Sequence, residues 1–255
     1  MNSIDFFREY KVKDTVFYIS IIEIEDINFD LKTKLDEYLP IICEGTTNGN
    51  LKLLKITLKK LFEKQTDNWL MGAIAEFFVH LFLNLMNYKQ NCLFLNLEEG
   101  QIKKGFDGLY VKNEEKWIME SKSGSINTKN ISHKNKLKEA IKDLNEKFSG
   151  KTTNNPWKNA YNHAAVMPIR NDNLLESIKK ISADFISNKF YNITDFNIIP
   201  SATIFLENLW IPIQKDKIFQ DIKDLLNDFN LKKAHIICIS QKSIDVFKKY
   251  IVIKD

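Results

Sequence analysis

The stretch that decides the fold of this chain is Gly105-Phe106-Asp107-Gly108-Leu109-Tyr110, followed closely by Trp117-Ile118-Met119-Glu120-Ser121-Lys122. We interpret the two segments as neighbouring strands, over residues 106–111 and 116–122, joined by a polar turn. Residues two apart on a strand point to the same face. Glu120 and Lys122 are therefore expected to share one face, with Ile118 behind them. Pairing of the two strands would bring Asp107 into the same pocket.

This set of two carboxylates and one ammonium has two interpretations. Mg²⁺ takes oxygen ligands, so Asp107 and Glu120 are candidates to hold it. Lys122 beside them would orient or help to activate a water, or hold a phosphate oxygen. The alternative is that Glu120 and Lys122 form a solvent-facing ion pair of little energetic value.

The segment before this hairpin predicts a buried helix. Residues 68–83 are apolar nearly all the way round, and Glu76 is their only formal charge. A buried carboxylate needs a partner or a metal, which makes Glu76 a candidate site residue. The alternative is a glutamate that faces water at one edge of the helix. We expect His80, one turn later, to be a hydrogen-bonded core residue rather than part of a site.

An Asp followed by Glu-x-Lys across a hairpin resembles the motif of the PD-(D/E)XK nuclease superfamily. The resemblance implies an α/β fold of restriction-endonuclease type, with a mixed central sheet flanked by helices. In this superfamily a glutamate on the helix before the strands often joins the metal site, and Glu76 has that position. The predicted order of one helix, three strands, a helix and a crossover to a further strand is compatible with this core.

A narrower resemblance covers about residues 68–148. Its motifs are Ala75-Glu76-Phe77-Phe78, Lys104-Gly105-Phe106-Asp107-Gly108 and Glu120-Ser121-Lys122. They are similar to those of the HamA family, the nuclease subunits of Hachiman anti-phage defence systems. Members of that family form a complex with a superfamily 2 helicase, HamB, encoded beside them, and are held in check until the helicase meets DNA. The resemblance therefore implies a DNA nuclease effector with a helicase partner.

Residue by residue, the resemblance implies that Asp107 and Glu120 hold Mg²⁺, that Lys122 assists the attacking water, and that Glu76 supports the site. The main-chain carbonyl of Ser121 is expected to join the metal ligands, so that Mg²⁺ polarises the scissile phosphate. Other interpretations stay open. The same residues suit a restriction or repair-type nuclease, or a non-catalytic DNA-binding subunit that keeps the fold.

The charge distribution favours a nucleic-acid partner. The whole chain carries a net charge of +4, whereas residues 129–158 hold eight lysines against three acidic residues. A basic stretch beside a metal site suits a phosphate backbone. The candidate DNA-binding residues are Lys134, Lys136, Lys138 and Lys142. A solvated helix face is the alternative for each of these lysines.

Cysteine usage and the N-terminus bear on the compartment. Cys43, Cys92 and Cys238 are far apart and show no metal-binding or disulfide spacing, which fits a reducing cytoplasm. No signal peptide is visible at the N-terminus. The apolar run near residues 77–86 is interrupted by polar residues and predicts a core helix, so we expect a cytoplasmic protein without membrane association.

Further elements follow from hydrophobic periodicity. We expect strands over residues 16–25, 93–97, 201–206 and 234–239, and helices over residues 51–62, 174–186 and 218–229. Ser132 should cap a helix with an apolar stripe at Leu137, Ala140, Ile141, Leu144 and Phe148, and Ser240 should cap a last helix. Residues 149–171 suggest a loop with one strand at 164–167. We divide the chain into a strand-containing extension over residues 1–50, whose exposed edge at 16–25 is a candidate for partner docking, and a nuclease domain over 51–255.

Overall fold

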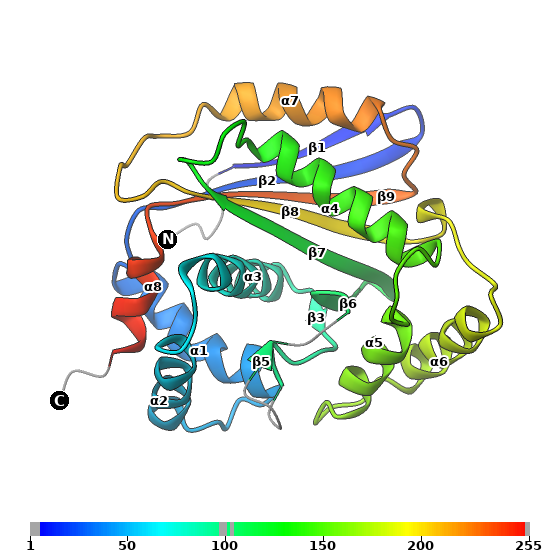
Figure 1. Ribbon diagram of the computed structural model, residues 1–255, viewed down its shortest axis with the longest axis horizontal. Coiled ribbons are helices and arrows are strands. Elements are labelled where there is room, and N and C mark those ends of the chain that lie inside the picture. The colour runs from blue at the N-terminus through cyan, green and yellow to red at the C-terminus, as the bar shows by residue number, and fades with distance from the viewer. Residues whose placement is uncertain (1–5, 97–100, 103–104, 253–255) are drawn as a thin grey trace.

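The computed structural model, which describes residues 6–96, 101–102 and 105–252, is an α/β structure built on a mixed seven-stranded sheet. Helices cover both faces of the sheet (Figure 1). The α/β class with a mixed sheet flanked by helices is therefore confirmed.

The sheet has the strand order β1-β2-β9-β8-β7-β6-β3, and its four inner strands β2, β9, β8 and β7 run parallel to one another. Antiparallel strands complete it on both sides. A separate ribbon pairs β4 with β5. The strands are β1 (Phe6–Val12), β2 (Thr15–Ile24), β3 (Lys89–Gln90), β4 (Leu95–Asn96), β5 (Gln101–Ile102), β6 (Gly108–Lys112), β7 (Glu115–Ser125), β8 (Asn197–Phe205) and β9 (Lys233–Gln241).

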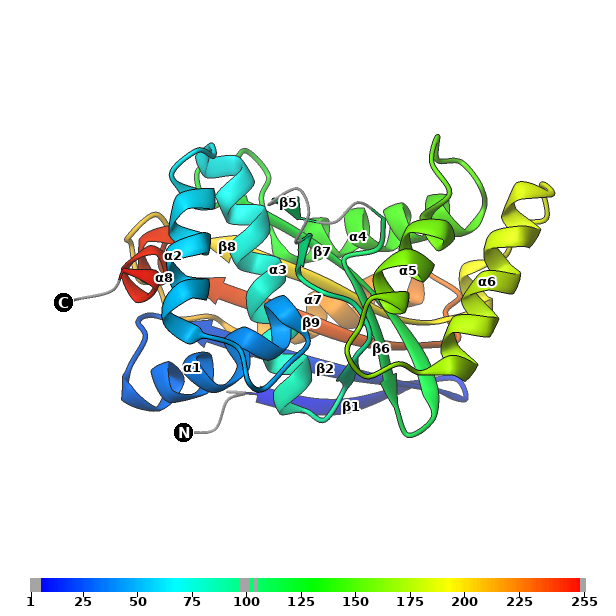
Figure 2. The same cartoon turned by 90° about the horizontal axis from the view of Figure 1, so that it is seen from below.

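The helices form two layers. One layer has α4 lying across β7 and β8 with α7 beside it, and the other has α3 against β7 with α1, α2 and α8 around it (Figures 1 and 2). The hairpin of α5 and α6 lies at one end. The helices are α1 (Phe29–Glu44), α2 (Leu51–Phe62), α3 (Asp67–Leu85), α4 (His133–Phe148), α5 (Pro156–Ala165), α6 (Asp172–Ile186), α7 (Lys215–Asn227) and α8 (Ile244–Ile251), with a 3₁₀ turn η1 (Ile193–Asp195).

Several sequence predictions are confirmed in detail. The hairpin of β6 and β7 forms as expected. Ser132 caps α4, because its Oγ accepts the N–H of Asn135 at 3.1 Å. The five residues of the predicted α4 stripe are all buried. Both β8 and β9 are buried along almost their whole length, as parallel strands covered on two faces should be.

The strand predicted at residues 93–97 is wrong as part of the main sheet. Strand β6 pairs with β7 on one side and with β3 on the other. Leu95 belongs instead to the separate ribbon of β4 and β5. Leu97 lies outside the described residues. The chain leaves the sheet here because it docks on the end of α1. Phe94 donates its N–H to the carbonyl of Ile42 at 3.0 Å.

Two further predictions along the chain are corrected. Residues 164–167 are not a strand but the end of α5 and the turn after it. Asn155 caps α5, because its side-chain oxygen accepts the N–H groups of Trp157 and Lys158, and Pro156 occupies the first turn. The dipeptide Asn155-Pro156 is therefore the sequence signal for the start of this helix. Ser240 lies within β9, and Ser243 takes the N-cap position of α8.

The segment at residues 16–25 is not an exposed sheet edge. It forms β2, which is paired on one side with β1 and on the other with β9, so β1 is the edge strand. Ile22 of β2 and Leu35 of α1 pack in the same core as α3. The division of the chain near residue 50 stays a prediction.

Within the described residues, α3 is long and apolar enough to cross a membrane by length and composition, and 67% of its apolar window is buried inside the structure. This agrees with a core helix. The three cysteines are buried and free.

A buried polar cluster ties the sheet to the end of α3. The ring of His235 on β9 contacts Ser20 Oγ through Nε2 and Tyr88 Oη through Nδ1, both at 2.9 Å. Burial, together with the positive charge of Lys112, lowers the pKa of His235 to about 3. The neutral imidazole suits this place because it offers one donor and one acceptor.

Replacing His235 with Gln should flatten the acid side of the stability profile. Between pH 6.5 and pH 3 the unfolded state binds a proton at His235 that the folded state does not, so stability falls as pH falls through this window. The slope from one such group is about 1.4 kcal/mol per pH unit. Urea unfolding of parent and variant at several pH values measures the difference. Parallel profiles for the two proteins would contradict this account.

Candidate functional site

Two glycines flank Asp107 where the chain enters β6. Gly105 has φ +125°, a conformation that side chains rarely adopt. A Cβ on Gly108 would lie 2.6 Å from the ring of Tyr110 and 2.8 Å from Cβ of Met119. Between them, Asp107 accepts the backbone N–H of Ser121 through Oδ2 at 2.7 Å.

Strand register places Asp107 beside Glu120. Gly108 pairs with Met119, so the next position along the two strands sets Asp107 opposite Glu120. Glu120 is only 2% exposed, although it carries a carboxylate. Ser201 on the neighbouring strand β8 donates its hydroxyl to the Glu120 carbonyl at 3.3 Å. The sequence prediction that Asp107, Glu120 and Lys122 come together agrees with this geometry.

Two lysines meet the Glu120 carboxylate. Lys122 Nζ lies 2.8 Å from Oε1, and Lys147 Nζ from α4 lies 2.6 Å from Oε2. Asp143, also on α4, lies 2.5 Å from Lys122 Nζ and 3.5 Å from Lys147 Nζ. Glu120, Lys122, Asp143 and Lys147 therefore form a closed group of alternating charges, which we call the charged quartet.

The ion pair of Glu120 and Lys122 is not the exposed pair considered from the sequence. Burial and then the Asp107 carboxylate raise the pKa of Glu120 to about 8, against the opposing effect of Lys147 and Lys122. Burial alone would raise the pKa of Asp143, but hydrogen bonds with Glu120 and Lys122 outweigh it and lower this pKa to about 2. Burial would lower the pKa of Lys122, but Glu120 and Asp143 outweigh it and raise it. Further positive charge near Glu120 would thus stabilise its ionised form.

Glu76 lies on α3, which packs on the face of the sheet opposite α4. It is buried, as expected, and its Oε1 lies 3.3 Å from Nε2 of His80. Tyr110 hydrogen-bonds to Nδ1 of the same ring. Burial, and the nearby charges of Cys92, Glu76 and Asp107, raise the pKa of Tyr110. The hydroxyl of Tyr110 therefore lies within electrostatic range of both Glu76 and Asp107.

The donor set suits a divalent cation that keeps part of its own shell. Among the described residues, no three His, Cys, Asp or Glu side chains gather closely enough to hold a metal ion alone. Mg²⁺ is commonly held by one or two carboxylates together with waters and substrate phosphate. Asp107 and Glu120 would supply that pair, and burial and the Asp107 carboxylate raise the pKa of Glu120, so a cation between the two carboxylates would favour its ionised form. Metal ligation by Glu76 and by the Ser121 carbonyl stays a prediction.

The lysines predicted to bind DNA lie along α4. Lys136, Lys138 and Lys142 line a surface groove of about 410 Å³ between α4 and residues 128–131, whereas Lys134 is half-buried and does not line it. Lys136 is paired with Glu139 at 2.7 Å. Lys138 and Lys142 are exposed, so two of the four are well placed for an extended anionic ligand.

Sequence reasoning missed the roles of Asp143 and Lys147. In the sequence they contribute only to the charge balance of residues 129–158. They lie one helical turn apart, however, and directly beside the stripe residues Leu144 and Phe148. Because residues four apart share a helix face, this border position carried the signal that both reach toward the sheet. No protein-family model and no curated protein matches the chain.

Replacing Lys147 with Met should destabilise the fold by about 1–3 kcal/mol, because the buried Glu120 carboxylate loses one of two charged partners. Lys142 on the same helix is exposed, and its replacement by Met should change stability by no more than about 0.5 kcal/mol. In a Glu120→Gln background, the loss from Lys147→Met should be smaller, as urea unfolding of the double-mutant cycle would show. Equal losses in both backgrounds would mean that Lys147 does not stabilise the fold through Glu120.

Proposed function

We propose that this protein is a metal-dependent deoxyribonuclease of the PD-(D/E)XK type. The observation that carries the proposal is the meeting of Asp107 and Glu120 on paired strands, with the Lys122 ammonium 2.8 Å from the Glu120 carboxylate. A mixed α/β sheet with helices on both faces is compatible with it. The resemblance of the residues 68–148 to HamA nucleases supports the same activity.

In this mechanism Asp107 and Glu120 would hold Mg²⁺, which supplies Lewis-acid polarisation of the scissile phosphate. Lys122 stabilises the negative charge that develops on the phosphate oxygens and orients the attacking water. To do so, its ammonium must turn from Asp143 or Glu120 toward the substrate. Lys147 remains on Glu120 and compensates the buried charge. Asp143 then serves as the residue that positions Lys122.

The substrate proposed for this site is DNA. The groove beside α4 carries Lys138 and Lys142 on its exposed side, and phosphate contacts of this kind position a backbone without reading its sequence. The groove and the charged quartet share α4, so a strand bound along the helix would pass toward Glu120.

The regulatory part of the proposal rests on the resemblance to HamA. A DNase with broad action must be restrained in its own cell, and we propose that a superfamily 2 helicase partner, similar to HamB, restrains and activates it in anti-phage defence. A stand-alone restriction or repair-type nuclease and a non-catalytic DNA-binding subunit are the competing functions. Cleavage with and without the helicase and ATP distinguishes the three.

Glu120→Gln and Lys122→Met should each lower Mg²⁺-dependent DNA cleavage by at least about a hundredfold, because the first removes the charge of a metal ligand and the second removes the ammonium that stabilises the reacting phosphate. Glu115→Gln is a matched control on the same strand, where Glu115 pairs with Lys233 instead. Plasmid nicking should be followed for the chain alone and for its complex with the helicase. Circular dichroism checks that each variant is folded.

Two results would overturn the assignment. One is a folded Glu120→Gln protein that cuts at the parent's rate. The other is a parent protein that shows no Mg²⁺-dependent cleavage either alone or in the helicase complex, which would favour the non-catalytic subunit.

Reversing the charge of Lys138 and Lys142 together should weaken DNA binding for all sequences alike. The slope of log affinity against log salt should become shallower by about two, because two phosphate contacts are lost. Fluorescence anisotropy with labelled duplexes in a Glu120→Gln background measures binding without cleavage. Lys59→Glu with Lys60→Glu, on exposed positions of α2, is the control. An unchanged slope would assign the α4 lysines to a solvated face.

A further inference from the structure

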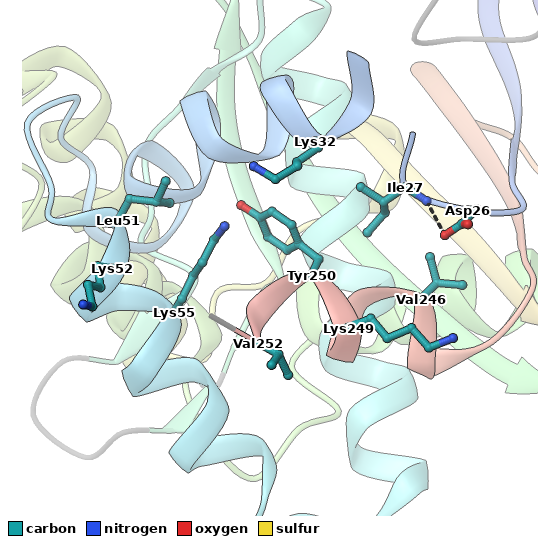
Figure 3. Close-up of a pocket in the computed structure, with 10 residues that line it drawn as sticks. All are labelled: Asp26, Ile27, Lys32, Leu51, Lys52, Lys55, Val246, Lys249, Tyr250 and Val252. Carbon is teal, nitrogen blue, oxygen red and sulfur yellow. Dashed lines mark hydrogen bonds between the residues drawn. The ribbon is translucent and has the colours of Figure 1, made fainter. Parts of the chain in front are cut away.

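A second charged hollow lies on the other side of the sheet. It is a pocket of about 600 Å³ where α1, α2 and α8 meet, and Figure 3 shows the lining side chains around Tyr250. It shares no lining residue with the charged quartet or the α4 groove. Its volume lies in the usual range of small-molecule sites.

The inner wall holds an excess of positive charge. Asp36 accepts Lys55 Nζ at 2.7 Å and Tyr250 Oη at 2.9 Å on Oδ1, and Lys32 Nζ at 2.5 Å on Oδ2. Lys55 is only 8% exposed, and its ammonium lies 4.0 Å from the centre of the Tyr250 ring. The single negative charge of Asp36 is thus shared by two ammonium groups, and a bound anion would neutralise the remaining positive charge.

The rim adds to this excess. Lys52 and Lys249 are exposed lining residues, and Asp26 is the acidic lining residue. With Asp36 included, four lysines and two carboxylates surround one hollow, with Lys52 and Lys249 on opposite sides of its rim (Figure 3). Lysine ammonium groups act as point charges for phosphate, and a pocket that focuses one sign of charge concentrates ligands of the other sign.

The remaining wall is apolar. Ile27, Leu51 and Val246 contribute aliphatic surface, and Tyr250 contributes an aromatic ring. The hollow is much larger than an inorganic phosphate needs. A ligand with a charged end and a flat or apolar body fits both parts of the wall.

We propose that this pocket binds a small organic phosphate of nucleoside-monophosphate size. The phosphate lies beside the ammonium group of Lys55; the long side chains of Lys52 and Lys249, which extend from opposite sides of the hollow in Figure 3, turn toward it, and the base and sugar cover the aliphatic wall. The site is separate from the nuclease proposed above, and its existence does not depend on that activity.

Isothermal titration of the full chain with AMP, in EDTA without added metal, tests the proposal. One AMP should bind per chain. Lys52→Ala combined with Lys249→Ala should weaken binding at least about tenfold, because contacts with charged donors are lost. Leu51→Trp should fill the hollow and abolish binding. Adenosine and inorganic phosphate should each bind far more weakly than AMP.

Two matched variants identify the site. Lys59→Ala with Lys60→Ala removes two exposed lysines from the same helix outside the pocket and should leave AMP affinity unchanged. Glu120→Gln should also leave it unchanged, which distinguishes this pocket from the charged quartet. The proposal falls if AMP gives no binding, if binding survives both pocket variants, if inorganic phosphate binds as tightly as AMP, or if Glu120→Gln abolishes binding.

Discussion

The structure depends on how one buried carboxylate is neutralised. Glu120 lies in the middle of β7 and is almost fully covered, where an unpaired charge would be strongly destabilising. Lys122 from the same strand and Lys147 from α4 compensate it, and Asp143 holds the two lysines in place. These contacts join α4 to β7 at the border of the apolar stripe by which the helix packs on the sheet.

The position of α4 on the sheet places charged side chains directly beside the apolar contact by which the helix packs. The stripe of α4 that ends in Leu144 and Phe148 packs on the sheet, and the charged residues beside it reach Glu120 at the border between core and solvent. Gly108, next to Asp107, lets the chain lie close to β7, because a Cβ there would come 2.8 Å from Cβ of Met119. Two carboxylates and two ammonium groups are therefore built into one buried cluster at the edge of the core.

The two helical layers carry different charged features. The α4 layer holds the charged quartet and the lysine groove, while the α3 layer holds the Glu76–His80–Tyr110 contacts and the lysine-rimmed pocket around Tyr250. Between them, the parallel strands β8 and β9 are covered on both faces, which cuts their polar side chains off from water; Asn197 Oδ1, Thr203 Oγ1 and Gln241 Oε1 are buried there without a hydrogen-bond partner, whereas His235 has two. The partners of His235 are Ser20 and Tyr88. The two charged features lie on opposite faces of the sheet, and Tyr110 is within electrostatic range of both Glu76 and Asp107.

The sequence by itself determined the local features, because period, caps and turns act over a few residues. It predicted the β6–β7 hairpin, the capped and striped helix α4, the buried helix with Glu76, and the shared face of Glu120 and Lys122. Tertiary structure decided the rest, because it depends on contacts between distant segments. The segment at residues 16–24 became an inner strand only through pairing with β9, and residues 93–96 lie outside the main sheet, where Phe94 donates its N–H to the carbonyl of Ile42. Asp143 and Lys147 joined the site only because α4 crosses β7, and Glu76 came to lie on the opposite face because α3 packs there. Strand order and helix placement follow from long-range burial, which no local pattern encodes.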